Sequence, residues 1–162
     1  MNEREDMQGR LTLQLTDEQG RVVMQISRKN RIVKTGRRLV AELFAGVTGG
    51  TSPSKVTHMA VGTDKTVAGD DQTKLGAEAA RNPITEVTFT EFDETSGGGT
   101  TRRVKATLKA IFDFGDANAA QPLTEAGIFT AATAGVMYNR VVFEPVTKTK
   151  AFKLTMMWDI TF

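Results

Sequence analysis

The sequence predicts a mainly β protein, an antiparallel β-sandwich with one main α-helix and one short helical turn. Apolar and polar residues alternate with period two along much of the chain, most regularly in 104–114 and 152–162. Glycine-rich turns such as 97–99 separate these stretches. Apolar residues at helical spacing are persuasive in one segment, about 35–45, and a short helical turn is expected at about 71–80.

Composition predicts one domain, residues 1–162, with one hydrophobic core. The chain has 162 residues, of which 40% are hydrophobic and 25% charged. It has no cysteine, which excludes thiol nucleophiles and cysteine metal sites. No apolar run approaches the roughly 20 residues of a membrane helix, and acidic residues nearly balance the basic ones. We therefore expect neither a membrane nor a nucleic acid as a partner.

The first thirty residues are expected to form a hairpin. Leucines alternate with polar residues in 11–15, apolar residues alternate in 22–26, and the turn between them, 17–20, ends in a glycine. The pattern leaves two positions open for this 1–30 segment. It lies on the sheet of the domain, or it projects as an arm toward a neighbouring subunit.

The helix at 35–45 has plausible ends and an unusual charge pattern. Thr35 is the expected N-cap and Gly46 the residue at which the helix stops. Arg37 and Arg38 then fall in the first turn, where each positive charge opposes the helix dipole by ~0.3–1 kcal/mol. We interpret the pair either as solvated or as a contact for an acidic partner surface.

Further strands are expected along the rest of the chain. The loop after the helix, 46–53, is glycine-rich and flexible by composition. The expected strands, in chain order, are 56–61, 86–90, 103–114, 123–131, 136–143 and 152–162. Because the last of these alternates without a break and is strongly apolar on one face, it should be buried.

The sequence contains little that supports catalysis, so we expect no enzyme, no catalytic residue, no cofactor and no metal. The one histidine, His58, lies in an expected strand, which suits a core or interface position. Asp113, Asp116 and Asn118 offer oxygen ligands, but their spacing matches no complete calcium loop.

One carboxylate has apolar neighbours on both sides. Glu125 would need a partner if it were buried, because an unpaired charge in a core is costly. Arg140 and Arg81 are the available cations. We assign Glu125 and Arg140 as a candidate structural ion pair.

Three segments stand out by their order along the chain: 36–46 (GRRLVAELFAG), 57–63 (THMAVGT) with Leu75, Glu78 and Arg81 downstream, and 123–129 (LTEAGIF). In this order they resemble small structural proteins of phage virions and the amino-terminal attachment domains of phage tail-collar fibre proteins. The closing segment, 137–162, is also similar to those proteins. The resemblance covers roughly 30–162.

The resemblance implies a structural subunit of the tail, the collar or neck, or the baseplate, incorporated into the virion after assembly in the host cytoplasm. Its partners would be copies of itself, in a ring or trimer-based assembly, and other virion proteins. Fibre proteins continue toward a receptor-binding tip, whereas this sequence stops, so we expect a freestanding component or an adaptor that anchors fibres. The candidate interface residues are Arg37, Arg38, Gly49, Gly50, Gly98, Arg102 and Arg103.

Three other functions remain open at this point. A capsid decoration protein differs from the preferred function only in its location on the particle. A carbohydrate-binding β-sandwich would expose aromatic rings on a flat face, and the candidates are Trp158 and Tyr138. A small hydrolase would have to use the single histidine.

Overall fold

The computed structural model describes residues 7–47, 49–50 and 53–162 of the protein. The described residues form a nine-stranded sheet and one helix. In chain order the elements are β1 (Gln8–Thr16), β2 (Val22–Lys29), β3 (Arg31–Ile32), α1 (Lys34–Ala45), β4 (His58–Gly62), β5 (Glu78–Ser96), β6 (Gly99–Phe112), β7 (Leu123–Phe129), β8 (Met137–Val146) and β9 (Lys153–Thr161).

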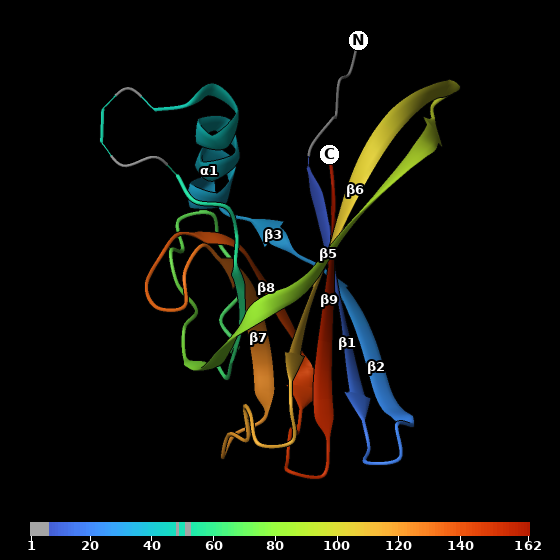
Figure 1. Ribbon diagram of the computed structural model, residues 1–162, viewed down its shortest axis with the longest axis vertical. Coiled ribbons are helices and arrows are strands. Elements are labelled where there is room, and N and C mark those ends of the chain that lie inside the picture. Colours follow the sequence, from blue (N-terminus) through green and yellow to red (C-terminus); the bar gives the residue numbers. More distant parts are fainter. Residues whose placement is uncertain (1–6, 48, 51–52) are drawn as a thin grey trace.

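All strand pairs are antiparallel, and the order across the sheet is β2-β1-β9-β6-β5-β4-β7-β8-β3. The 19-residue strand β5 joins the two halves of the sheet. Its first residues pair with β4 and the rest pair with β6. The strand runs through the centre of the molecule in Figure 1. The predicted mainly β, antiparallel class is confirmed, but the strands form one continuous sheet through β5 in place of the two separate sheets of a sandwich.

The sheet curls until its two ends are linked by the chain itself. Strand β2 leads through Asn30 directly into β3, which pairs with β8 at the other end of the strand order. The Asn30 side chain stabilises this crossing, because its Oδ1 accepts a hydrogen bond from Trp158 Nε1 at 2.7 Å. Trp158 is fully buried in the core that the curled sheet encloses.

The core follows from the alternation seen in the sequence. Every second residue of β1, of the second half of β6 from Ala106 to Phe112, and of β9 is buried on the inner face of the sheet. Each such large apolar side chain contributes ~1.5–3 kcal/mol when fully buried. In β9 these residues are Leu154, Met156, Trp158 and Ile160.

The helix lies where the apolar stripe places it, but its start differs from the prediction. The N-cap position is Val33, which makes no side-chain cap. Thr35 lies inside the helix, and its Oγ1 donates to the Met137 carbonyl at 2.7 Å. The hydroxyl that was expected to cap the helix therefore bonds to β8. Gly46 ends the helix with φ 76°, and its N–H donates to the Glu42 carbonyl.

The helical turn expected at about 71–80 is wrong. Strand β5 already begins at Glu78, and the residues before it form an irregular loop. The N–H groups of Gly76 and Ala77 donate to the carboxylate of Glu125 rather than to carbonyls one turn back. A side chain from β7 thereby replaces the hydrogen bonds that a helix would have made.

The amino-terminal hairpin lies on the sheet, because β1 pairs with β9 along its whole length. Residues 1–6 of that expected segment lie outside the described residues. In the loop expected at 46–53, residues 48 and 51–52 also lie outside them, and the described residues 47, 49–50 and 53 belong to neither a helix nor a strand.

We predict that Gly36→Ala destabilises the protein by loosening α1 from β8. A Cβ at this position would collide with the backbone carbonyl of Tyr138. We expect a loss of about 1–3 kcal/mol in the free energy of unfolding, as for other overpacked sites, measured by urea denaturation. Gly69→Ala is the control, since nothing lies within 4 Å of its Cβ. Equal stability of the two variants would contradict this packing.

Candidate functional site

The structure brings Glu125 of β7 and Arg140 of β8 together as a fully buried ion pair. Both side chains have 0% exposure, and Glu125 Oε2 lies 2.8 Å from both Nε and an Nη of Arg140. Arg81, the alternative partner, instead pairs with Glu78 and lies over the ring of Phe129, 3.7 Å from its centroid.

The carboxylate of Glu125 also holds one side of the loop between β4 and β5, residues 63–77. It accepts hydrogen bonds from the N–H groups of Asp64, Gly76 and Ala77, at 3.3, 3.0 and 2.8 Å. Because these donors come from both ends of the loop, the side chain of Glu125 holds the two ends together. The sequence gives no signal for this, since the donors are backbone groups.

The guanidinium of Arg140 binds the middle of the same loop. It donates to the Thr66 carbonyl at 2.7 Å, to Gln72 Oε1 at 3.0 Å and to Asp64 Oδ2 at 3.0 Å. With Glu125 satisfied as well, the pair has the additional hydrogen bonds that a desolvated ion pair requires. We interpret the pair as structural, because neither member reaches the surface.

The possible calcium ligands form a different kind of site. The ammonium of Lys148, 3% exposed, donates to the Asp113 carbonyl, Asn118 Oδ1 and the Thr149 carbonyl at 2.9–3.2 Å. Burial lowers the pKa of this ammonium. No group of three possible metal-binding side chains occurs within the described residues. The cation that the Asp113 carbonyl and Asn118 Oδ1 bind is therefore the ammonium of Lys148.

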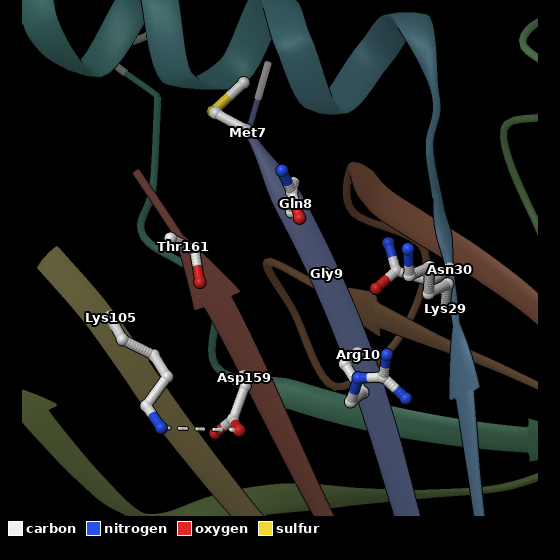
Figure 2. Close-up of a pocket in the computed structure, with 9 residues that line it drawn as sticks. All are labelled: Met7, Gln8, Gly9, Arg10, Lys29, Asn30, Lys105, Asp159 and Thr161. Carbon is white, nitrogen blue, oxygen red and sulfur yellow. Dashed lines mark ion pairs between the residues drawn. The ribbon is translucent and has the colours of Figure 1, made fainter. Parts of the chain in front are cut away.

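A pocket of about 350 Å³ lies where β1, β6 and β9 approach the β2–β3 crossing (Figure 2). Lys105 and Asp159 form an ion pair on one side of it at 3.7 Å, and Arg10 and Lys29 lie on the other side. Asn30 Nδ2 has no acceptor among the described residues. The lining is cationic and polar.

His58 lies outside this pocket, on β4 between β5 and β7. It is half-buried, and its Nδ1 forms a hydrogen bond with Thr57 Oγ1 at 2.8 Å. One ring nitrogen of His58 is therefore bonded to the hydroxyl of the residue that precedes β4.

The outer part of the β5–β6 hairpin projects from the body of the molecule, and we call residues 86–104 the arm (Figure 1). Its turn has positive φ at Gly97 (58°) and Gly98 (85°), which suits glycine in a two-residue hairpin turn. Ion pairs cross its strands, among them Arg102–Asp93 at 3.0 Å.

The arm carries exposed apolar side chains on the face that continues from the core. Val87 and Phe89 pair with the buried residues Leu108 and Ala106, yet they are 49% and 72% exposed. Val104, on the second strand of the arm, is 40% exposed. The inner face of the sheet therefore continues onto the arm, where no described part of the chain covers it.

A second projection, at the same end of the molecule in Figure 1, is the carboxy-terminal half of α1. Phe44 is 93% exposed and Leu43 is 48% exposed. Arg38 pairs with Glu42 at 2.6 Å along the helix.

The candidate interface residues divide between α1 with the loop that follows it and the arm. Arg37 and Arg38 lie exposed on α1, Gly49 and Gly50 follow it, and Gly98 and Arg102 lie on the arm. Arg103 is a correction: its side chain is 4% exposed, 3.3 Å from Glu94, and presents no free guanidinium. The sequence does not reveal that Phe44, Val87 and Phe89 are exposed, since alternation and helical spacing are the same whether or not a face is covered.

Comparisons with family models, curated proteins and solved structures find no match to this chain. The helix of the described residues is too short and too polar to cross a membrane.

We predict that Glu125→Gln lowers the free energy of unfolding by about 3–5 kcal/mol, the cost of breaking a buried pair. The glutamine would remove the negative charge that pairs with the buried Arg140. Its amide N–H group would also face a backbone N–H group, so neither could accept a hydrogen bond from the other. Urea denaturation measures the loss, and hydrogen exchange should be faster at Gly76 and Ala77.

The control for this variant is Asp71→Asn. Asp71 pairs with Lys34 at 2.5 Å, but the two side chains are 85% and 68% exposed. Its removal should change the stability by less than about 1 kcal/mol. A loss as large as that of Glu125→Gln would contradict the special role of the buried pair.

Proposed function

We propose that the protein is a structural subunit of a bacteriophage virion, a component of the tail, collar or baseplate that assembles with copies of itself and with other virion proteins. One observation carries the proposal: two projections at one end of the molecule expose apolar side chains. Phe44 and Phe89 are 93% and 72% exposed. Burying such a side chain contributes ~1.5–3 kcal/mol, so each is a ready source of association energy.

The resemblance in the sequence supports the same proposal. The segment 36–46 forms α1 and its end, and therefore one of the two projections. The segments 57–63 and 123–129 contain the neighbouring strands β4 and β7. The segments that resemble phage tail and neck proteins thus include two neighbouring strands of the sheet and one of the two projections.

The other functions find less support in the structure. The aromatic residues that a sugar-binding face would need, Trp158 and Tyr138, are 0% and 4% exposed. No observation favours a hydrolase over a structural subunit. A capsid decoration protein would use the same contacts at another place on the particle.

The proposal predicts that the protein is present in purified phage particles in a fixed ratio to the major capsid protein. Quantitative mass spectrometry of particles from a lysate that contains this chain measures the ratio. Immunogold electron microscopy then places the chain at the tail, neck or baseplate. A phage-encoded lysis enzyme, which is not part of a particle, is the negative control. Absence of the chain from purified particles would contradict the proposal, and gold on the head would favour a decoration protein.

A further inference from the structure

We infer that the arm of one copy binds α1 of a second copy. The inference rests on the proposed function, because it names the contact through which copies assemble. The residues that meet are Val87, Phe89 and Glu91 on the arm and Arg37, Ala41 and Phe44 on α1.

The exposed face of α1 has a charged end and an apolar end. Arg37, Ala41 and Phe44 are spaced four and three residues apart, so they share one face of the helix, and all are exposed. Gly36 and Leu39 face the sheet and are buried. The stripe from Arg37 to Phe44 is about 10 Å long at 1.5 Å per residue, and the small Ala41 at its centre allows close approach.

The arm carries a stripe of the same kind. Val87, Phe89 and Glu91 alternate along β5 and therefore share one face. Four residues of strand span about 13 Å, so the apolar pair and the carboxylate are separated on the same scale as Phe44 and Arg37. One orientation of the helix places Arg37 at Glu91 and Phe44 over Val87 and Phe89.

Within the described part of one chain, the ion pairs leave one charge on each stripe, and the two charges are opposite in sign. On the arm, Glu86, Asp93 and Glu94 pair with Lys109, Arg102 and Arg103. On α1, Lys34 pairs with Asp71 and Arg38 pairs with Glu42. Among the described residues, Glu91 and Arg37 form no ion pair. Arg37 Nε lies 3.5 Å from the Ile32 carbonyl, and the nearby carboxylate of Asp70 pairs with Arg31.

Charge also selects the combination of surfaces. Contact between two arms or between two helices would offer Glu91 or Arg37 no opposite charge, because each stripe carries a charge of one sign. The pairing of an arm with a helix joins opposite charges at one end and apolar side chains at the other. Complementary charges of this kind favour the correct partner and orientation.

Charge reversal tests the contact. Sedimentation velocity of the full chain between about 1 and 100 μM covers the affinity of a modest interface. We expect self-association of the unaltered protein, and a loss of about tenfold or more in affinity for Glu91→Arg or Arg37→Glu alone. The double variant, and an equimolar mixture of the two single variants, should recover association, because both restore opposite charges. Arg37→Glu places an acid in the first turn of a helix, which favours folding.

The matched controls are Glu18→Arg and Lys150→Glu. They make the same charge changes in the β1–β2 and β8–β9 turns, which lie at the opposite end of the molecule in Figure 1. Both should associate like the unaltered protein. Circular dichroism and the melting temperature verify that every variant is folded.

Either of two results would overturn the inference: a monomer at every concentration, or single variants that associate like the controls. Neither would refute the proposed function, which depends on the presence of the chain in virions. Conversely, self-association that follows the charge rule in a protein absent from virions would leave the contact standing and refute the proposed function.

Discussion

The buried ion pair between Glu125 and Arg140 is the constraint on which the rest of the structure depends. Placing two charges in a core is costly, and the cost is offset only when every polar atom finds a partner. Here those partners come from the loop 63–77. Because Glu125 accepts the N–H of Ala77, one residue before β5 begins, the pair also fixes the starting point of the strand that becomes the arm.

The architecture separates a rigid body from the surfaces available for contact. The curled sheet encloses a core around Trp158 and is closed by the β2–β3 crossing at Asn30. Strand β5 leaves this body as part of the arm, and α1 packs on β8 through Gly36. Both projections are thus anchored in β strands of one sheet, so a partner that binds them meets surfaces whose relative position is already set.

The sequence predicts where the strands and the main helix lie better than it predicts where the elements begin and end. Alternation located β1, β2, β6 and β9, and the apolar neighbours of Glu125 were sufficient to expect a buried pair. The helical turn at 71–80 was wrong because a distant carboxylate takes the N–H groups that local pattern assigns to a helix. The expected Thr35 cap failed for a similar tertiary reason. The exposure of Phe89 could not be predicted, since alternation does not reveal how far a sheet extends beyond its core.

We infer that a body held together by a buried ion pair presents the arm and α1 for assembly. Hydrogen exchange with mass spectrometry, at a dilute and an assembling concentration of the unaltered protein, tests it most directly. The account predicts new protection in peptides covering 86–95 and 35–46, and unchanged, strong protection of Gly76 and Ala77. New protection confined to the β1–β2 or β8–β9 turns, or rapid exchange of Gly76 and Ala77 in both samples, would contradict it.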